Sequence, residues 1–401
     1  MRCWKARVSP PAFIEMATTE GSIAGGGVLL FFWLTHRLLP GLIVAGFLAL
    51  FAPLATAADW RVSQPGWTYV FPQDHGPHPE FKTEWWYFTG NLSDAGGRRF
   101  GYQLTLFRQG LRPPAERLSG ASRFVIGDVK FGHFALSDVA SQRFTFQEKL
   151  SRGAFGEAGF GADGRLAWLE DWSIELAADG QFHLRAQNDQ KSIDLILTSV
   201  KPWAVHGVDG ISRKAAGDGH ASHYYSGTRM RSEGRVMVDG QGFAVHGESW
   251  FDHEWATNQL APGQSGWNWF SLLLDDGSEL MIYQMRLSNG GIDAASSGSF
   301  IAPDGRVQHL KGSDFELQPM TVWTSSRSGA KYPVSWQIRV PSLGLDLETS
   351  TPLRDQELVV GPGAYWEGLV DAKGMRKERP VAAHGYMELT GYAGPLQGLS
   401  K

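Results

Sequence analysis

Residues 85–108 read WWYFTGNLSDAGGRRFGYQLTLFR, and residues 267–286 read WNWFSLLLDDGSELMIYQMR. Each stretch opens on an aromatic cluster, passes through a turn that contains aspartate, and ends its second half on an arginine. Apolar and polar residues alternate within both halves, which predicts a β-hairpin in each place. The sequence therefore places two similar hairpins about half a chain apart.

We interpret the two hairpins as an internal duplication, although aromatic-rich hairpins also look alike for purely local reasons. In this interpretation Phe88, Leu92 and Asp94 correspond to Phe270, Leu274 and Asp276. The run 102–104 (Tyr-Gln-Leu) corresponds to 283–285 (Tyr-Gln-Met), with one residue less in the turn. The halves then divide near residue 255, which predicts domains at 58–255 and 256–401.

The rest of the chain after residue 60 favours short strands. Alternating segments such as 99–108 and 235–250 are separated by Asp-Gly, Gly-Gly or proline turns, and we find no long amphipathic helix. Regularly spaced short strands are typical of a meander closed into a barrel, which removes exposed sheet edges. The predicted fold is all-β, with two tandem antiparallel β-barrels.

Composition excludes several classes of partner. The 401 residues are 42% hydrophobic, enough for a core in each of two domains. A formal charge of -4 gives no basic excess, so we expect no nucleic-acid partner. The one cysteine, Cys3, precedes any mature domain, so the folded part has neither a disulfide nor thiolate chemistry.

The N-terminal 57 residues read as an extension followed by a secretory signal. Arg37 precedes an apolar run over 38–54, and Ala-Thr-Ala at 55–57 offers small residues for cleavage. We expect a periplasmic or secreted protein. An uncleaved membrane anchor is the alternative, but Pro40 and the polar residues at 35–37 interrupt the apolar run.

The densest polar and aromatic cluster is 246–255, HGESWFDHEW. In a strand, Glu248, Trp250, Asp252 and Glu254 share one face with His246, and His253 lies on the other. Carboxyls crowded in an aromatic pocket raise one another's pKa, which keeps a general acid protonated near neutral pH. The plainer interpretation is a surface or domain junction in which the acids pair with arginines such as Arg229 and Arg231.

Two further clusters contain histidine. In a strand, His223, Tyr225 and Arg229 share a face and approach the acids from a neighbouring strand, although a lone histidine is more often structural. His75, His78 and Glu84 offer metal ligands, but their spacing matches no closed His/Cys pattern, so we expect no metal. No Gly-x-Ser-x-Gly elbow surrounds Ser226 or Ser249, and no phosphate-binding loop occurs.

Residues 78–92, HPEFKTEWWYFTGNL, resemble the opening motif of AttH-like proteins, also called predicted secreted hydrolases, which join the carotenoid 1,2-hydratases in a lipocalin-like superfamily. The resemblance continues through 222–229, 249–254 and 266–271, and then through 365–368 (YWEG) and 385–392 (GYMELTGY). It covers nearly everything after the signal.

The resemblance implies two tandem lipocalin-like barrels, a pocket for an apolar lipid or terpenoid ligand, no cofactor, and association with an ABC transporter of lipid or lipoprotein type. In the hydratases a carbon–carbon double bond is protonated and water is added. The matching positions are Asp252 as proton donor, surrounded by His223, Tyr225 and Trp250. We expect the ligand to be bound by Glu84, Trp85, Trp86, Tyr87, Arg229, Glu248, Glu254, Trp267 and Trp269.

Two departures weaken the match to the hydratases. Tyr225 stands where they would have tryptophan, and Trp250 where they would have tyrosine. Two hypotheses follow: an enzyme that performs acid–base addition, elimination or hydrolysis on an apolar substrate, or a lipid carrier without catalysis. Only the enzyme needs a protonated aspartate in its cavity.

Overall fold

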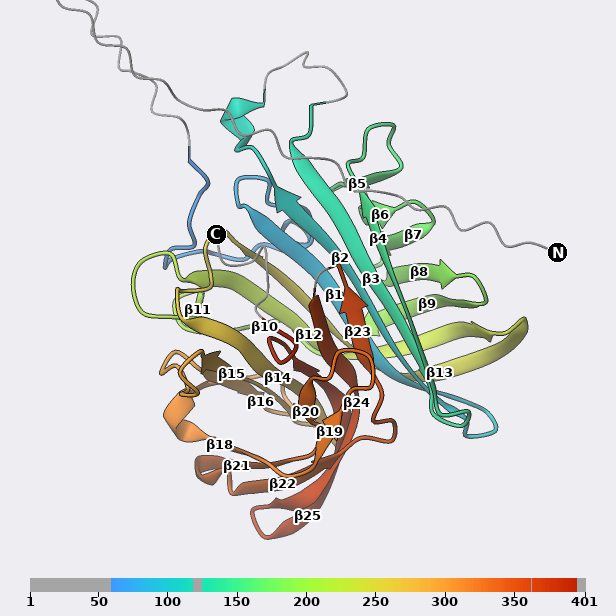
Figure 1. The fold of residues 1–401 in the computed structure, drawn as a ribbon, viewed down its shortest axis with the longest axis vertical. Coiled ribbons are helices and arrows are strands. Elements are labelled where there is room, and N and C mark those ends of the chain that lie inside the picture. The colour runs from blue at the N-terminus through green and yellow to red at the C-terminus, as the bar shows by residue number, and fades with distance from the viewer. Residues whose placement is uncertain (1–58, 118–124, 362, 395–401) are drawn as a thin grey trace, which may run out of the picture. The chain divides into compact units, whose positions relative to one another are not determined.

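A computed structural model describes residues 59–117, 125–361 and 363–394, so the expectations for residues 1–57 fall outside the described part. The described chain is almost entirely β, as predicted (Figure 1). No helix in these ranges has the length and apolar character needed to cross a membrane. The helical turns are short: η1 (Gln73–His75), η2 (Pro114–Glu116), η3 (Gly312–Asp314) and η4 (Pro341–Leu343).

The first sheet has 13 strands and forms a nearly closed antiparallel barrel. Its order is β4-β3-β2-β1-β13-β12-β9-β8-β7-β6-β5, with β10 and β11 paired to β12. The strands are β1 (Thr83–Asp94), β2 (Arg99–Gly110), β3 (Asp128–Asp138), β4 (Arg143–Ser151), β5 (Ala158–Phe160), β6 (Arg165–Leu169), β7 (Trp172–Leu176), β8 (Phe182–Asn188), β9 (Lys191–Ser199), β10 (Ala204–Val205), β11 (Ser212–Arg213), β12 (Ala221–Val238) and β13 (Gln241–Ala256).

The second sheet has 10 strands in the order β17-β16-β15-β14-β25-β24-β22-β21-β18, with β23 paired to β24, and β19 and β20 form a separate small ribbon. The strands are β14 (Gln264–Leu274), β15 (Glu279–Leu287), β16 (Ser297–Ile301), β17 (Val307–Lys311), β18 (Glu316–Pro319), β19 (Val322–Thr324), β20 (Lys331–Pro333), β21 (Trp336–Val340), β22 (Leu345–Ser350), β23 (Glu357–Val360), β24 (Gly363–Arg376) and β25 (Arg379–Leu389).

The two sheets repeat one topology. In each, the first hairpin is followed by two more strands on one side, and its first strand pairs with the last strand of the sheet, β1 with β13 and β14 with β25. The change from one sheet to the other falls between Ala256 and Gln264. The topology thus supports the duplication that the two aromatic hairpins suggested.

The residue match within the hairpins holds for the first strand and fails in the second. Phe88 and Phe270 both point into their barrels, whereas Tyr102 lies in the first core and Tyr283 lies outside the second barrel. The cause is register: Tyr102 pairs with Gly90, but Tyr283 pairs with Trp269. An odd shift of register moves a side chain to the opposite face of the sheet.

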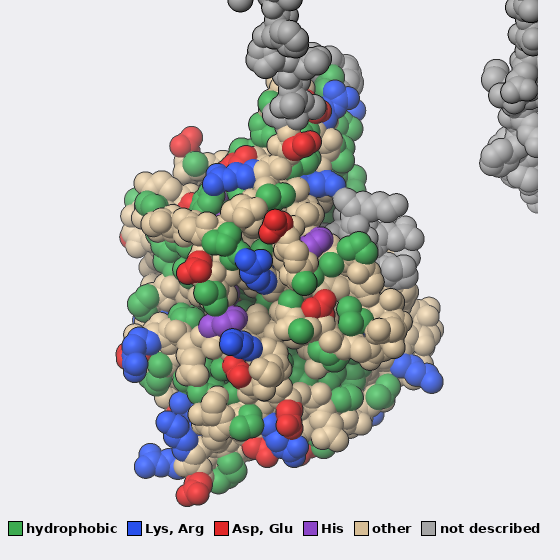
Figure 2. Space-filling view, turned by 90° about the vertical axis from the view of Figure 1, so that its left-hand side faces the viewer, with side chains coloured by type: hydrophobic (Ala, Val, Ile, Leu, Met, Phe, Trp, Pro, Cys, Tyr) green, Lys and Arg blue, Asp and Glu red, His purple; other side chains and the backbone are tan. Residues whose placement is uncertain are grey.

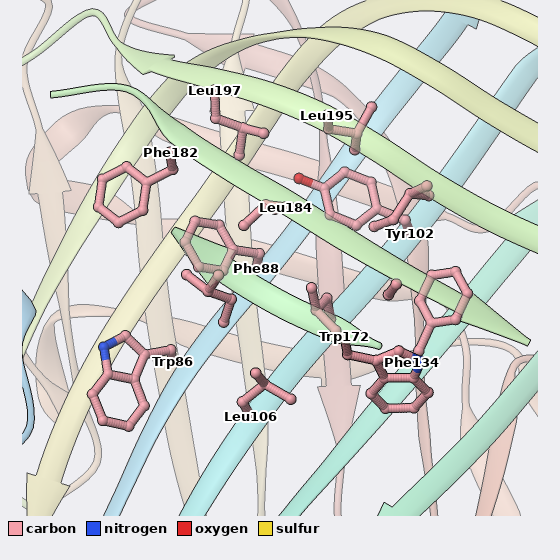
Figure 3. Packing of buried hydrophobic residues seen from close by; sticks show 14 of the residues in the cluster. Trp86, Phe88, Tyr102, Leu106, Phe134, Trp172, Phe182, Leu184, Leu195 and Leu197 are labelled. Atoms are coloured by element: carbon pink, nitrogen blue, oxygen red, sulfur yellow. The ribbon is translucent and has the colours of Figure 1, made fainter. Parts of the chain in front are cut away.

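Each barrel has its own apolar core. Figure 3 shows the first one, in which aromatic and leucine side chains from neighbouring strands point toward one another; Phe88 and Phe182, for example, have ring centroids 5.6 Å apart. Strands with one solvated face alternate cleanly, as in β22, where every second residue is buried. β1 and β13 are instead buried on both faces over much of their length.

The second barrel covers the outer face of those strands. A separate apolar cluster joins the barrels and includes Tyr87, Trp250, Trp269 and Leu369. At its edge Arg229 Nε–H donates to Glu279 Oε1 at 2.6 Å, and Lys201 Nζ donates to Oε2 at 2.7 Å. On the molecular face drawn in Figure 2, by contrast, acidic and basic side chains are interspersed.

Candidate functional site: an acidic cavity between two barrels

A cavity of about 390 Å³ lies between the two sheets. Its walls are mainly apolar and aromatic, and several acidic side chains interrupt them. The wall residues on which the site depends are Trp85, Tyr87, Phe107, Phe131, His133, Lys214, Tyr224, Asp252, Glu254, Trp267, Trp269, Tyr283, Tyr365, Glu367 and Glu388.

The first strand of each barrel supplies corresponding walls. Trp85 and Tyr87 of β1 point out of the first barrel into the cavity, and Trp267 and Trp269 of β14 do so from the second. Tyr87 packs edge-on against Trp269, with ring centroids 5.5 Å apart. The duplicated hairpins therefore face each other, and all four of these predicted ligand-binding residues line the cavity.

Asp252 is held on the wall contributed by the first barrel. Trp250 Nε1–H donates to Asp252 Oδ1 at 2.6 Å, and the Tyr224 hydroxyl donates to Oδ2 at 2.8 Å. The Ser226 hydroxyl also donates to Oδ1, and Trp269 Nε1–H donates to the Tyr224 hydroxyl at 3.3 Å. Both carboxyl oxygens are thus fixed by donors, and the carboxyl faces the cavity.

A buried histidine contacts Ser226, one of the donors to Asp252. His206 Nε2 lies 2.6 Å from the Ser226 hydroxyl, and His206 Nδ1 lies 2.9 Å from the Ser299 hydroxyl. Because Ser226 gives its proton to Asp252, its oxygen must accept from Nε2–H, and Nδ1 then accepts from Ser299. Burial, together with the charge of Lys214, lowers the pKa of His206, so the ring is neutral as this chain of donors requires.

The environment of Asp252 opposes its ionisation. Burial raises the pKa of this carboxyl to about 7, the nearby charge of Glu254 adds to the rise, and the hydrogen bonds from Ser226, Trp250 and Tyr224 limit it. Asp252 therefore exchanges its proton near neutral pH. A carboxyl in that condition can act as either a general acid or a general base.

Glu254 has a different partner. Lys214 Nζ lies 3.1 Å from Glu254 Oε1 and 4.1 Å from the centroid of the Tyr283 ring. The Ser222 hydroxyl donates to the same carboxylate oxygen. Glu254 is thus part of an ion pair on the cavity wall, and its charge acts on Asp252 beside it.

The second barrel contributes two more acids, Glu367 and Glu388, which are cross-strand neighbours on β24 and β25. Trp267 Nε1–H donates to Glu388 Oε2 at 2.8 Å. Burial raises the pKa of both carboxyls, and the charge of Glu388 raises that of Glu367 further. Glu388 stands across from Trp269 on β25, as Asp252 stands across from Tyr87 on β13, so the two acids occupy corresponding positions.

Two predicted partners of Asp252, His223 and Tyr225, lie on the other face of the sheet. His223 Nδ1–H donates to the Gly210 carbonyl at 3.0 Å, and the Tyr225 hydroxyl contacts His75 Nδ1 at 2.6 Å inside the first barrel. Of the three residues expected around Asp252, the structure therefore brings only Trp250 to it. His206 and Tyr224 take the places expected for the other two.

A bulge in β12 explains the difference. Near the Asp239-Gly240 turn the pairing runs regularly and puts Met230 opposite Ser249, a register that would continue to place Gly227 opposite Asp252. The irregularity between Gly227 and Met230 instead puts Ser226 opposite Asp252. One extra residue exchanges the two faces of the strand beyond it.

Glu84 and Trp86 were also expected at the ligand but point into the first barrel, because they alternate with Trp85 and Tyr87. Trp86 stacks on His253 with ring centroids 4.6 Å apart. Glu84 Oε1 lies 2.8 Å from His78 Nδ1 and 3.1 Å from His253 Nε2. The side chains of Glu84, His78 and His253 have the spacing of a metal site.

The surroundings of that trio argue against a cation. Arg108 Nε–H donates to Glu84 Oε2 at 3.0 Å, which places a permanent positive charge beside the carboxylate. Glu84 Oε1 is already shared between the two histidines. The donor set is therefore engaged internally and does not fit a metal, and we assign it a structural role.

Glu248 and Arg229 form an ion pair at the junction of the two barrels, which was the plainer interpretation of the acidic cluster. Arg229 Nη1–H donates to Glu248 Oε1 at 2.8 Å, and His384 Nε2 lies 3.2 Å from Glu248 Oε2. Neither Glu248 nor Arg229 lines the cavity. They link the barrels at the edge of the cavity and not on its wall.

Comparison with known proteins agrees with this architecture. A crystal structure of a protein from Nitrosomonas europaea assigned as AttH is 32% identical, with a TM-score of 0.74 over 82% of this chain and 98% of that one. Kievitone hydratase from Nectria haematococca has 13% identity and a TM-score of 0.63, covering 81% and 94% of the two chains. CghA has 12% identity and a TM-score of 0.51, covering 84% and 98%. No curated protein sequence matches.

The fold is thus a lipocalin-like double barrel that the AttH structure and kievitone hydratase share, and in this chain the acidic cavity lies between the two halves. A sequence model of the AttH-like family matches residues 62–392. The chain belongs to the AttH-like family.

Proposed function

We propose that this protein binds a largely apolar small molecule between its barrels and adds water to it, or removes water from it, by acid–base catalysis without a cofactor. The observation that carries the proposal is Asp252, a buried carboxyl that faces an aromatic cavity and exchanges its proton near neutral pH. A protein that only carries lipid has no use for such a group. The hydratase among its structural neighbours makes hydration the reaction to test first.

The step balances with Asp252 alone. In hydration of a double bond, one carbon takes a proton from the Asp252 carboxyl and the other takes the oxygen of water, whose released proton returns to Asp252. Aromatic faces such as those of Trp85 and Trp267 stabilise positive charge that develops on a hydrocarbon. His206, Ser226 and Tyr224 keep the carboxyl in place during the cycle.

The test compares the wild-type protein with Asp252→Asn. Protein purified from its own periplasm is analysed by native mass spectrometry and lipid extraction after incubation in isotopically labelled water. We expect labelled product from the wild type, a loss of product on the order of 100-fold or more in the variant, and parent compound trapped in the variant. Asp194→Asn, at an exposed position of β9, is the matched control. Equal turnover by both proteins contradicts the role of Asp252, and an intact lipid bound equally to both favours a carrier.

The proposal also includes export of the protein and association with an ABC transporter, and both rest on the sequence. The signal-like segment at 36–59 supports a periplasmic or secreted location, and the family resemblance supports association with an ABC transporter. Cell fractionation and N-terminal sequencing of the mature chain test the location. Recovery of the full-length chain from the cytosol would contradict it.

A further inference from the structure

The outer face of the first barrel carries a row of apolar side chains that begins in the cavity and ends at the surface. It crosses β1 to β4, which lie side by side in the first sheet (Figure 1). Trp85 of β1 pairs with Phe107 of β2. Phe107 in turn pairs with Phe131 of β3, which pairs with Leu150 of β4. Directly opposed residues of antiparallel strands project to the same side of a sheet, so these four side chains form one apolar ladder.

The side chains of the apolar ladder touch one another but are not covered. The rings of Phe107 and Phe131 stack with centroids 4.5 Å apart, and those of Trp85 and Phe107 lie 6.5 Å apart. These three aromatic residues are only partly buried and line the cavity, whereas Leu150 is 70% exposed. Cross-strand aromatic pairs stabilise a sheet by themselves, but an uncovered apolar row that leaves a cavity is also a surface for a ligand.

The apolar ladder is one side chain wide. On the side nearer the acids, the next row of the same face consists of Thr105, His133 and Glu148. On the other side the ladder is bordered by Gln109 and Val129. Three strand spacings give it a length of about 14 Å. A surface so long and narrow fits a single hydrocarbon chain better than it fits a flat ring system or the surface of another protein.

The turn between β23 and β24 of the second barrel lines the same cavity beside the ladder. Its residues Val360, Gly361 and Ala364 are part of the cavity wall. Gly361 N–H donates to Glu148 Oε2 at 3.3 Å, which holds the turn against the row next to the ladder. The three aromatic residues of the ladder therefore face a space that both barrels enclose.

The inner end of the apolar ladder reaches the acids. Trp85 pairs with Glu254 of β13, and Asp252 lies two residues from Glu254 on the same face of that strand. Asp252 and Trp85 both line the cavity. A chain that lies along the ladder thus extends past Trp85 into the part of the cavity that contains Asp252.

We propose that the apolar ladder binds a linear hydrocarbon chain, so that the substrate of the cavity is a long-chain compound whose reacting carbon atoms lie beyond Trp85. This deepens, and rests on, the proposed acid–base function, because it names the substrate class on which Asp252 acts. Each methylene group that leaves water for the ladder adds to the affinity. Affinity therefore rises with chain length until the chain reaches Leu150.

The test measures how straight-chain primary alcohols, from hexanol to tetradecanol, displace the neutral fluorescent probe N-phenyl-1-naphthylamine from the purified protein. We expect affinity to rise about two- to four-fold per methylene group and then to level off, once the chain is longer than the ladder. Phe107→Ala and Phe131→Ala should each weaken the binding of decanol by about 10-fold. Leu150→Thr alters an exposed position outside the core, and it should make affinity level off at a shorter chain.

Phe155→Ala is the matched control, because Phe155 is 75% exposed and belongs neither to the ladder nor to the cavity wall. Circular dichroism and melting curves establish that each variant is folded. Farnesol has the same main-chain length as dodecanol but carries methyl branches. Tighter binding of dodecanol assigns the chain to an acyl-type substrate, and tighter binding of farnesol assigns it to an isoprenoid.

Three results would overturn the proposal: affinity that is independent of chain length, ladder variants that bind every alcohol as the wild type does, or binding of phospholipid vesicles through Phe131 and Leu150 without binding of alcohols. Any of these, together with turnover that depends on Asp252, would leave the proposed function intact. Binding of alcohols through the ladder, together with turnover that is unchanged in Asp252→Asn, would instead retain the chain site and contradict the proposed function.

Discussion

At the scale of single residues, the site consists of side chains whose role depends on which face of a strand they occupy. The sequence was sufficient to place Trp250, Asp252 and Glu254 on one face, because alternation within a single strand needs no knowledge of its neighbours. It could not show which residues of β12 stand beside Asp252. That depends on the bulge between Gly227 and Met230, and no residue type marks it.

His206, Glu367 and Glu388 were missed for a related reason. Each is an isolated polar residue in its own segment, and only the packing of distant strands gives it partners. One signal in the sequence points to Glu388. If the duplication includes the last strand of each half, β13 and β25, Glu388 corresponds to Asp252. Glu367 lies in the family-like run 365–368, but that resemblance carried no role for it.

The pKa of Asp252 has a consequence for stability. The carboxyl has an ordinary pKa of 3.8 and a folded value of about 7, so the folded state binds the proton more tightly. The contribution of Asp252 to the free energy of unfolding therefore falls as pH rises from about 4 to about 7. The asparagine side chain in Asp252→Asn does not titrate, so the stability of this variant relative to wild type should rise by on the order of 2–4 kcal/mol across that range. Urea unfolding of both proteins at several pH values measures the difference, and a difference constant with pH would contradict the assignment.

At the scale of elements, close approach of β2 to the second barrel depends on a glycine. A Cβ on Gly101 would lie 2.4 Å from Leu369 Cγ and 2.6 Å from the Tyr386 hydroxyl oxygen, on β24 and β25. Gly101→Ala must therefore displace the Leu369 and Tyr386 side chains, which are buried where the two barrels meet. We expect it to lower the free energy of unfolding by about 1–3 kcal/mol.

Gly363→Ala is the matched control for Gly101, because the nearest atom to its added Cβ would be 4.0 Å away. Chemical denaturation measures both variants. Equal stability of Gly101→Ala and wild type would show that the strands can separate without cost and that the barrel contact is loose.

At the scale of the whole molecule, the barrels share an apolar boundary that neither can bury alone. The joining cluster contains Trp250 and Tyr224 from the first barrel and Trp269 and Tyr386 from the second. A truncated first half that ends after residue 257 keeps Trp255, which is buried in the first core. We expect this first half to be insoluble or to aggregate, because large exposed apolar surfaces associate.

Co-expression of residues 58–257 with residues 258–401 is the companion experiment, and it should recover soluble complex. Size-exclusion chromatography and thermal melting distinguish the outcomes. A first half that is monomeric and melts cooperatively on its own would contradict a shared interface, and with it a cavity that needs both barrels.

The topology of the whole molecule was largely predictable, because strand length, turn chemistry and the repeated aromatic hairpin all follow from local sequence. The cavity between the barrels was not. Its location depends on which outer faces of β1, β13, β14 and β25 meet. These strands are buried on both faces over much of their length, so the sequence shows no clean alternation that would mark the outer face. The resemblance to the family predicted a pocket, and the structure placed it between the two barrels.

The most direct measurement is an infrared titration of the wild-type protein against Asp252→Asn, since the C=O stretch of a protonated carboxyl is separate from the bands of a carboxylate. In the difference spectrum between wild type and variant, which cancels the bands of Glu367 and Glu388, the account predicts a protonated-carboxyl band that is present below about pH 7 and disappears as pH rises through that value. If the two proteins give the same spectra at every pH above about 5, Asp252 is an ordinary ionised acid. The acid–base role that we propose for the cavity would then be wrong.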